Sequence, residues 1–427
     1  MRSGVDIIVI GAGAAGLAAA KEATQHGARV LVLEGRDRIG GRIHTLASPS
    51  APFATELGAE FVHGRPDSTW GLIRNLELSA YDVPFDHHER RHGRLAKADD
   101  FDARLEDAMR GLAKLRGPDV SFSNYLTRSR VSELKRSTAL DFVKGFDAAD
   151  PERISARSLA KEWADIGNTE DNTQFRLLTG YGALVAGLLR SIDRRLLKLR
   201  LREQVTGVHW KPGEAAIHTR RRVYRAPRVV ITLPLGILQR PPGGPGAVHF
   251  DPPVPALRRV HDIGFGGVVK VLLEFDRPFW EDDEDTADAS FLHTPGSAFP
   301  TWWTARPLRS CRLTGWAGGP VADALGNADE SRLRRCAIQS LADLFHRARG
   351  FLGARLCRFY AHNWLTDPFS RGAYSYALVG QDTAASELAR PVAGTLCFAG
   401  EALDTENPAT VAGALTSGKR AGHWAAH

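Results

Sequence analysis

Apolar and polar positions in the N-terminal segment follow the order of a strand, a helix and a second strand. Val5–Ile10 is apolar at every position but one, as expected for a buried parallel strand. The glycine-rich segment Gly11–Gly16 interrupts this run, and the alanine-rich stretch Leu17–His26 predicts a helix. Arg29–Leu33 then predicts a second strand, so the pattern predicts a βαβ unit.

The middle of the chain has a different pattern. From about Tyr81 to Arg200 the sequence is charged, and apolar residues recur at helical spacing. One apolar face would carry Phe101, Leu105, Ala108, Leu112 and Leu115, and another would carry Leu184, Leu188 and Ile192. We therefore expect a helical insertion after the βαβ unit.

Strand patterns return after this insertion. The candidate strands are Val205–Trp210, Ala216–Thr219, Val229–Leu233, Val268–Phe275 and Leu396–Ala399, and candidate helices cover roughly Ser331–Arg347 and begin near Thr410. This order of elements predicts an α/β fold with two discontinuous domains. The length of 427 residues also suits two domains better than one core.

Composition limits the cellular setting that we expect. The chain contains four cysteines and no C-x-x-C pair, which favours a reducing compartment. It contains no run of about 20 apolar residues, so we expect no transmembrane helix. The first strand follows Met1 closely enough that we expect no signal peptide, and we expect a cytoplasmic protein.

The chain is basic, with a net charge of +7 and a pI of about 9.4. Its basic residues are mostly arginines scattered along the sequence, with only short runs such as Arg220–Arg222. This distribution favours a solvated surface over a nucleic-acid interface. The sequence has no H-E-x-x-H, G-x-S-x-G or P-loop motif, and we expect no metal ligands.

The glycine-rich turn has the spacing Gly11-x-Gly13-x-x-Gly16. Gly11 permits the tight turn, Gly13 lets the backbone approach a pyrophosphate, and Gly16 lets helix and strand pack closely. Glu34, at the end of the second strand, would accept hydrogen bonds from ribose hydroxyls. In this context the motif predicts a bound dinucleotide whose phosphates face the helix N-terminus.

A second constellation, Glu34–Arg42, directly follows the carboxylate that would bind the ribose. Its two adjacent glycines and an arginine could supply backbone donors and a fixed cation for the phosphates. A plain NAD-binding fold does not need this extension. Taken alone, the segment could also be an exposed charged loop.

Together with Leu57–Gly64, these motifs make the sequence resemble the FAD-dependent amine oxidase family. The segments Phe398–Glu401 and Ala409–Gly418 resemble the family's closing flavin motif, and the resemblance covers nearly the whole chain. It implies a glutathione-reductase-like, Rossmann-type FAD-binding domain formed by residues 1–80, 200–262 and 390–427. It also implies a mixed-sheet and helical substrate-binding domain formed by residues 81–199 and 263–389, which completes the amine oxidase fold.

The resemblance also assigns residues to the cofactor. Val205 would contact the adenine through its backbone, Glu401 would lie near the ribityl–phosphate chain, and Trp364 would pack near the isoalloxazine. The implied FAD residues are Gly11, Gly13, Ala15, Gly16, Glu34, Arg36, Gly41, Arg42, Gly58, Ala59, Glu60, Phe61, Val205, Trp364, Gly400, Glu401, Thr410 and Val411. We expect noncovalent FAD, because Ala373 stands where monoamine oxidases carry the cysteine that is bonded to the flavin.

Lys270 lies in the middle of an apolar strand candidate. A buried ammonium group is costly, so its place there needs a reason. From the pattern alone, Lys270 could lie on an edge strand and reach solvent. The resemblance implies instead that Lys270 holds a water molecule at the flavin N5 atom.

The segment Arg371–Tyr376 places two tyrosines two residues apart. On a strand, Tyr374 and Tyr376 would share a face, as ordinary sheet aromatics also do. In the resembling family, the residue that matches Tyr374 forms one wall of an aromatic cage that orients the substrate amine. The second wall is a tyrosine in monoamine oxidases, whereas this sequence has Thr410, as polyamine oxidases and histone demethylases do. This departure argues against a small monoamine held between two rings.

Other positions separate the branches of the family. His63 resembles a residue of polyamine oxidases that would lie at the active-site mouth, although a lone histidine could equally be structural. L-Amino-acid oxidases carry an arginine for the substrate carboxylate after the Gly58-Ala59 pair, whereas the first arginine here is Arg65. The histone demethylases carry an additional N-terminal helical domain and a coiled-coil tower, whereas this sequence starts at the predicted FAD strand and shows no long heptad insertion, so we expect no chromatin function.

We therefore expect FAD-dependent oxidation of an amine, with a polyamine or another secondary or primary amine favoured, and with Lys270, Tyr374 and His63 as catalytic residues. The product imine would hydrolyse to an aldehyde and an amine, and O₂ would be reduced to hydrogen peroxide. The alternatives are an L-amino-acid oxidase or monooxygenase, a same-fold flavin desaturase or porphyrinogen oxidase, and a flavin-bearing binding protein. We expect a small-molecule amine as the partner, no nucleic-acid or membrane partner, and a monomer or homodimer.

Overall fold

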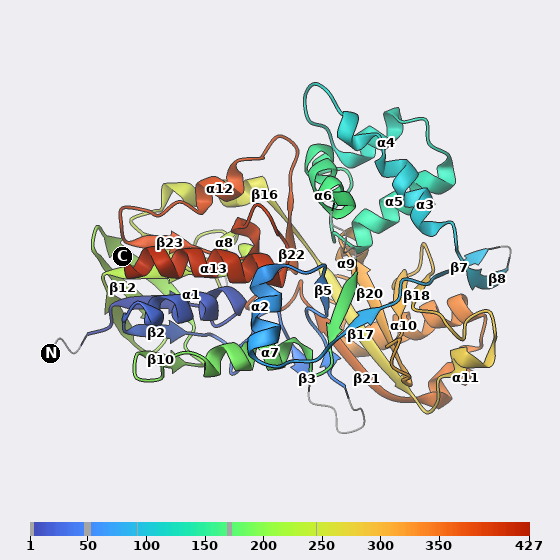
Figure 1. Ribbon diagram of the computed structural model, residues 1–427, viewed down its shortest axis with the longest axis horizontal. Coiled ribbons are helices and arrows are strands. Elements are labelled where there is room, and N and C mark those ends of the chain that lie inside the picture. Colours follow the sequence, from blue (N-terminus) through green and yellow to red (C-terminus); the bar gives the residue numbers. More distant parts are fainter. Residues whose placement is uncertain (1–3, 47–52, 92, 169–172, 245) are drawn as a thin grey trace.

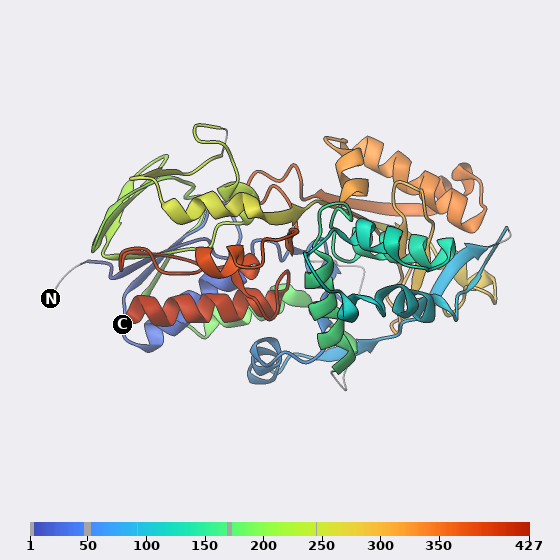
Figure 2. The ribbon, with the colours of Figure 1, turned by 90° about the horizontal axis from the view of Figure 1, so that it is seen from above.

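The computed structural model describes residues 4–46, 53–91, 93–168, 173–244 and 246–427. Figure 1 shows two lobes side by side, and both ends of the chain lie in the same lobe. The view from above in Figure 2 shows the same division. Among the described residues, no helix has the length and apolar character needed to cross a membrane.

The lobe with the chain ends, called here the nucleotide lobe, is built on a five-stranded parallel sheet. Its strands lie in the order β10 (Leu197–Arg200), β2 (Val30–Leu33), β1 (Ile7–Ile10), β14 (Arg228–Ile231) and β23 (Leu396–Phe398). Both β1 and β2 are buried along their whole length, because helices cover one face of the sheet and a second sheet covers the other. The predicted βαβ unit is confirmed.

Two helices on one face of this sheet, α1 (Ala14–Gln25) and α13 (Val411–Ala426), lie directly against each other (Figure 1). Their backbones approach closely because a side chain at Gly418 would collide with Ala15, and one at Gly422 would collide with Ala19. The final helix expected near Thr410 is confirmed, and Thr410 is its N-cap.

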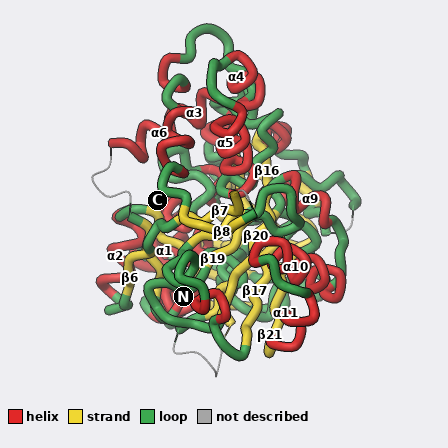
Figure 3. The backbone as a smooth tube through the Cα atoms, turned by 90° about the vertical axis from the view of Figure 1, so that its right-hand side faces the viewer, coloured by secondary structure: helices red, strands yellow, loops and turns green. Residues whose placement is uncertain are grey.

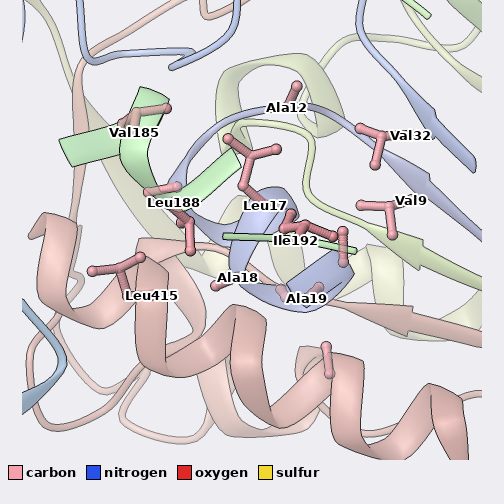
Figure 4. Packing of buried hydrophobic residues seen from close by; sticks show 14 of the residues in the cluster. Val9, Ala12, Leu17, Ala18, Ala19, Val32, Val185, Leu188, Ile192 and Leu415 are labelled. Carbon is pink, nitrogen blue, oxygen red and sulfur yellow. The ribbon is translucent and has the colours of Figure 1, made fainter. Parts of the chain in front are cut away.

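The core between these helices and α7 (Gly180–Arg190) is shown in Figure 4, where Leu17, Leu188 and Leu415 are buried together. Helix α1 begins three residues before the predicted start at Leu17. Gly13 has extended backbone angles and is the N-cap of the helix. Residues 14–16 therefore already belong to its first turn.

A four-stranded sheet covers the other face of the parallel sheet. Its order is β13 (Val223–Ala226), β12 (Glu214–Thr219), β11 (Val205–Lys211) and β15 (His249–Asp251). Its apolar residues share a core with the parallel sheet. The sequence patterns located β11, β12, β14 and β23 to within two residues at each end.

The other lobe, called here the substrate lobe, is built on a seven-stranded sheet. Its order is β21 (Leu356–Asn363), β17 (Val268–Phe275), β20 (Arg312–Gly318), β19 (Thr301–Trp303), β18 (Phe291–His293), β7 (His87–Arg91) and β8 (Arg94–Lys97). Strand β17 pairs with β20 on one side and with β21 on the other, so the predicted strand is confirmed as an interior strand. Helices α9 (Pro320–Leu325), α10 (Glu330–Phe345) and α11 (Arg349–Arg355) share a separate core with this sheet.

Helices α3 (Phe101–Met109), α4 (Phe122–Arg128), α5 (Glu133–Gly145) and α6 (Ala156–Asn168) form a group with its own core at the top of Figure 3. The predicted apolar face is buried at Phe101, Leu105, Ala108 and Leu112. The expected helical insertion is confirmed in its helices, but its described residues also contain five strands that the pattern did not predict: β6 (Ala80–Val83), β7, β8, β9 (Gln174–Leu177) and β10. These strands are too short for a clear period-two signal.

The domain division stays a prediction. The contacts of residues 180–200 favour a different boundary from the one that we predicted. Helix α7 packs against α1, and β10 pairs with β2, so both belong to the nucleotide lobe in space although we assigned residues 81–199 to the substrate domain. The remaining elements are α2 (Asp67–Asn75), α8 (Leu235–Leu238), α12 (Ala384–Leu388), β3 (Thr45–Leu46) paired with β4 (Thr55–Glu56), β16 (Ile263–Gly266) paired with β22 (Tyr374–Ala377), and β5 (Phe61–His63) paired with β9.

Candidate active site

A large cavity of about 2890 Å³ is lined by residues of both lobes. The predicted site residues that line it are His63, Lys270 and Tyr374, together with Gly11, Gly13, Ala15, Glu34, Arg36, Gly41, Arg42, Gly58, Ala59, Glu60, Phe61, Val205, Trp364, Gly400, Glu401, Thr410 and Val411. Gly16 is the one predicted site residue that does not line the cavity. The fold therefore brings segments from the whole length of the chain to one space.

The glycine turn has the geometry that its spacing predicts. Gly11 has a φ of +107°, and a Cβ atom there would lie 2.5 Å from the hydroxyl oxygen of Thr232. A Cβ atom at Gly16 would collide with the Gly11 carbonyl group, so Gly16 acts in helix–strand packing and not at the cavity. The nearest atom to a Cβ at Gly13 is the Gly40 carbonyl oxygen, at 3.8 Å, which leaves Gly13 open to the cavity.

Glu34 ties the second strand to this turn. Its carboxylate accepts hydrogen bonds from the backbone N–H groups of Ala12 and Arg36, each at 2.8 Å. Glu34 is buried but still lines the cavity. A carboxylate can accept about four hydrogen bonds, so two acceptor positions remain for ligand hydroxyl groups.

Arg36 is held by an aspartate from the substrate lobe. Its guanidinium group donates two hydrogen bonds to Asp367, at 2.8 and 2.6 Å, and His362 lies 3.0 Å from the same carboxylate. Burial alone would raise the pKa of Asp367, but the hydrogen bonds from His362 and Arg36 outweigh it and hold the pKa well below its usual range. Sequence reasoning missed this role of Asp367, because the pair is separated by 331 residues.

Arg42 and Glu401 form a second link between distant segments. Arg42 Nη1 donates to Glu401 Oε1 and to the Ala373 carbonyl oxygen, both at 2.6 Å. The other oxygen of Glu401 accepts a hydrogen bond from the Ser375 hydroxyl group, also at 2.6 Å. The loop that carries Ala373 is therefore fixed against the nucleotide lobe.

These residues fit a bound dinucleotide flavin. The first turn of α1 has no side-chain cap, so its backbone N–H groups are available to an anionic group at Gly13. The first turn of α13 also borders the cavity at Thr410 and Val411. The cavity volume exceeds the roughly 300–1,000 Å³ of an ordinary small-ligand pocket, which leaves space for both a dinucleotide and a substrate.

Lys270 is fully buried and occupies an interior strand, so it is not the edge-strand lysine that the pattern alone allowed. Its Nζ atom donates to Glu60 Oε2 at 2.7 Å and to the Gly58 carbonyl oxygen at 3.1 Å. It also lies 5.5 Å from the ring centre of Trp303 and 6.0 Å from that of Trp316. The ammonium group is thus paired and placed at the cavity wall.

Glu60 has a role that the sequence did not indicate. Besides Lys270, its carboxylate contacts Arg176 Nε at 2.8 Å and accepts a hydrogen bond from Trp303 Nε1 at 3.1 Å. Burial would raise the pKa of Glu60, but the positive charges of Lys270 and Arg176 lower it. Three protein donors thus engage this carboxylate, which leaves about one acceptor position for a ligand.

Aromatic rings and a hydrogen-bonded tyrosine form the adjacent wall. Tyr374, Trp316 and Trp364 belong to one apolar cluster with Ala373. The Tyr374 hydroxyl group donates to the Phe146 carbonyl oxygen at 2.6 Å, and Trp364 Nε1 donates to the Leu57 carbonyl oxygen at 3.0 Å. These bonds fix the orientation of the two rings.

His63 lies on this side of the cavity, with its ring centre 5.4 Å from that of Phe146. The side chain is exposed to the cavity, and partial desolvation by the surrounding protein lowers the pKa of His63 to about 4. The imidazole is therefore neutral at neutral pH and can accept one hydrogen bond.

Two acidic residues of the cavity were missed by sequence reasoning, Asp147 and Glu162. The Oδ2 atom of Asp147 is buried without a hydrogen-bond partner. Burial and the charge of Glu162 raise the pKa of Asp147 well above its usual range. Burial, followed by the charges of these two carboxylates, also raises the pKa of Tyr374. Neither acid lies in a recognisable motif.

Comparison with known proteins agrees with this geometry. The family model described as Flavin containing amine oxidoreductase matches residues 14–136 and 121–422. The human protein Lysine-specific histone demethylase 2 is 26% identical over 446 residues, which cover 97% of this chain and 52% of the demethylase. Polyamine oxidase 2 of Arabidopsis thaliana is 26% identical over 447 residues, which cover 96% of this chain and 86% of that protein. The chain thus spans about half the length of the demethylase relatives.

Solved structures share the fold over nearly the whole chain. Putrescine oxidase bound to putrescine matches with a TM-score of 0.80 at 20% identity, covering 98% of both chains. Cyclohexylamine oxidase from Brevibacterium oxydans matches with a TM-score of 0.80 at 22% identity, covering 99% of both chains. Since the family model matches most of the sequence, the chain belongs to the family of flavin-containing amine oxidoreductases.

Proposed function

We propose that the protein uses noncovalent FAD to oxidise a polyamine or another secondary or primary amine to an imine. The imine hydrolyses to an aldehyde and an amine, and O₂ takes the electrons to give hydrogen peroxide. The main supporting observation is that one cavity joins the glycine turn of the nucleotide lobe to Lys270 and Tyr374. When bound, the flavin supplies the two-electron acceptor for this reaction.

The protein residues bind, orient and enclose the substrate. Lys270, fixed by Glu60 and Gly58, holds a water molecule at the cavity wall. Tyr374 presents its ring to the substrate amine, because the hydrogen bond to Phe146 fixes the ring. His63, as a neutral imidazole, accepts a hydrogen bond from the substrate.

Asp147 and Glu162 favour a substrate with a second positive charge. A carboxyl group such as Asp147, with one buried oxygen unpaired, gains most from a cationic partner, because an ammonium group would both donate a hydrogen bond and offset the burial. Glu162 adds to the negative potential near Tyr374. A diamine or polyamine can place one nitrogen before Tyr374 and a second nitrogen at these acids.

The substrate class is tested by anaerobic titration of the holoprotein while the flavin absorbance is followed. The panel contains spermine, spermidine, N-acetylated polyamines, putrescine, benzylamine and several L-amino acids. Bleaching by polyamines and not by benzylamine or amino acids supports the proposal. Bleaching by amino acids alone contradicts the polyamine assignment and leaves the flavin assignment intact. Hydrogen peroxide release on addition of air tests the electron acceptor.

Noncovalent attachment is tested separately. Ala373 has no side-chain atom that could bond to a flavin, and its carbonyl oxygen accepts a hydrogen bond from Arg42. Heat or acid precipitation should release all of the flavin into the supernatant. Yellow colour retained in the washed pellet would contradict this part of the proposal.

A further inference from the structure

Three histidines meet at one end of the nucleotide lobe, outside the cavity. His26 is the C-cap of α1, and His423 and His427 lie four residues apart at the end of α13. One potential ligand atom from each side chain lies within 4.8 Å of the other two. All three residues are exposed, so their rings are accessible to an ion from solvent.

The packing of α1 against α13 causes this convergence. The contact of Ala15 with Gly418 and the contact of Ala19 with Gly422 run in the same order along both helices, so the helices are parallel and their C-terminal ends lie together. Figure 1 and Figure 2 show the two helices side by side. Without these glycines, side chains would separate the helices and the histidines on them.

Glu22 completes a set of four possible ligands. Its Oε1 atom lies 3.3 Å from His26 Nε2 and 3.4 Å from His423 Nδ1. His26 and His423 are edge to face, with ring centres 5.3 Å apart, and His427 is 4.6 Å from His26. Both helices end here, so the partial negative charge of two helix C-termini also favours a cation.

We propose that His26, His423, His427 and Glu22 bind one divalent transition-metal ion, with Zn²⁺ as its representative. Three imidazoles and one carboxylate suit Zn²⁺, Cu²⁺ or Ni²⁺, whereas Mg²⁺ and Ca²⁺ prefer oxygen ligands. Tetrahedral Zn²⁺ with Zn–N bonds of about 2.0–2.1 Å needs nitrogen atoms about 3.4 Å apart. The three ligand atoms lie within 4.8 Å of one another, so coordination requires the exposed side chains to rotate and close a difference of up to about 1.4 Å.

The ion would tie the C-terminal ends of α1 and α13 together. The opposite ends of these helices line the cavity at Ala15 and Val411. A ligand that binds only the folded state stabilises it by mass action. The metal should therefore raise the temperature at which the holoprotein releases its flavin, although no metal ligand touches the cofactor site.

The experiment uses holoprotein produced without a polyhistidine tag, treated with a chelator and desalted. Calorimetric titration with ZnCl₂ should show one Zn²⁺ per chain at micromolar concentrations. The variants His26→Ala and His423→Ala should each weaken binding by about tenfold or more. His261→Ala is the matched control, because His261 is exposed and lies outside the cluster. This variant should bind Zn²⁺ as the wild type does.

Co²⁺ provides a spectroscopic test of the ligand set. Tetrahedral coordination by imidazoles should give intense visible absorption in the wild type, and His26→Ala should lose it. The flavin spectrum and circular dichroism of each variant verify folding, and exposed positions make unfolding a minor concern. Binding only at millimolar Zn²⁺, or equal affinity in the wild type and His26→Ala, would overturn the proposal. So would a flavin-release temperature that Zn²⁺ does not change in the wild type.

Discussion

The two ends of the cavity are built in different ways. At the nucleotide end, the cavity is formed by a turn between consecutive elements, and backbone groups at Gly11 and Gly13 face or shape it. At the amine end, side chains converge from separate segments, with Lys270 on β17, Tyr374 on β22 and Asp147 after α5. The first end depends on local conformation and the second on the packing of the substrate lobe.

Cofactor binding and substrate binding therefore place different requirements on the sequence. A cofactor recognised through backbone N–H groups needs residues that permit close approach, and those residues must be adjacent in sequence. A substrate recognised through charge and ring orientation needs side chains at defined positions in space, whatever their positions in sequence. Damage at the first end should therefore abolish cofactor binding, whereas damage at the second should change rates and specificity.

The largest effect is expected from Gly16→Val at the nucleotide end. A side chain here would collide with the Gly11 carbonyl group and force α1 away from β1. We expect protein without bound flavin and a loss of stability of at least about 2 kcal/mol. The measurements are the flavin absorbance per chain and thermal unfolding. Gly71→Ala is the control, because no atom lies within 4 Å of a Cβ at Gly71. Full flavin content in Gly16→Val would show that the close contact is dispensable.

At the amine end, Lys270→Met should leave flavin bound and slow the chemistry. The methionine keeps the apolar stem but removes the ammonium group that would hold water, so we expect flavin reduction or reoxidation to slow by about tenfold or more. Stopped-flow measurement of both half-reactions checks this. Lys198→Met on β10 removes an exposed strand lysine and should change neither rate. Unchanged half-reactions in Lys270→Met would remove Lys270 from the catalytic group.

A smaller and more selective effect is expected from Asp147→Asn. The substitution removes the carboxyl group that we expect to ionise when it pairs with the second nitrogen of the substrate. A hydrogen bond to a charged group contributes about 1.5–3 kcal/mol, so KM for spermidine should rise by about tenfold or more. Primary monoamines that bleach the flavin serve as internal controls, and their KM should change little. An equal rise for both substrate types would indicate a general packing role for Asp147.

The smallest effect on stability is expected from Asp367→Asn, which removes the ion pair with Arg36 that links the two lobes. This effect depends on pH. The pKa of Asp367 is held below its usual range, so this carboxylate stabilises the fold above about pH 4, and the contribution is lost as the pH falls below that value. Asp367→Asn should cost about 1–2 kcal/mol at neutral pH. The difference in thermal midpoint between the two proteins should shrink towards acidic pH. A difference that stays constant down to pH 3 would mean that ionisation of Asp367 does not stabilise the link.

The sequence was informative where chemistry depends on neighbouring residues. The glycine spacing, the carboxylate at Glu34 and the apolar strand around Lys270 all located features that the structure contains. It was less informative for short strands, such as β7 and β8, which contain too few residues for a periodic signal. It also could not tell whether the strand of Lys270 was at an edge or in the interior.

What the sequence determined by itself is the βαβ unit with its glycine turn and the family, whereas the cofactor residues stay a prediction. The glycines act through backbone geometry, and Glu34 acts on the neighbouring backbone N–H groups of Ala12 and Arg36, so the order of residues largely fixes both. Only the tertiary structure paired Glu60 with Lys270, Asp367 with Arg36, and His26 with His423 and His427. These contacts join residues that are distant in the chain, because each depends on how helices and strands pack and not on the local spacing of residues.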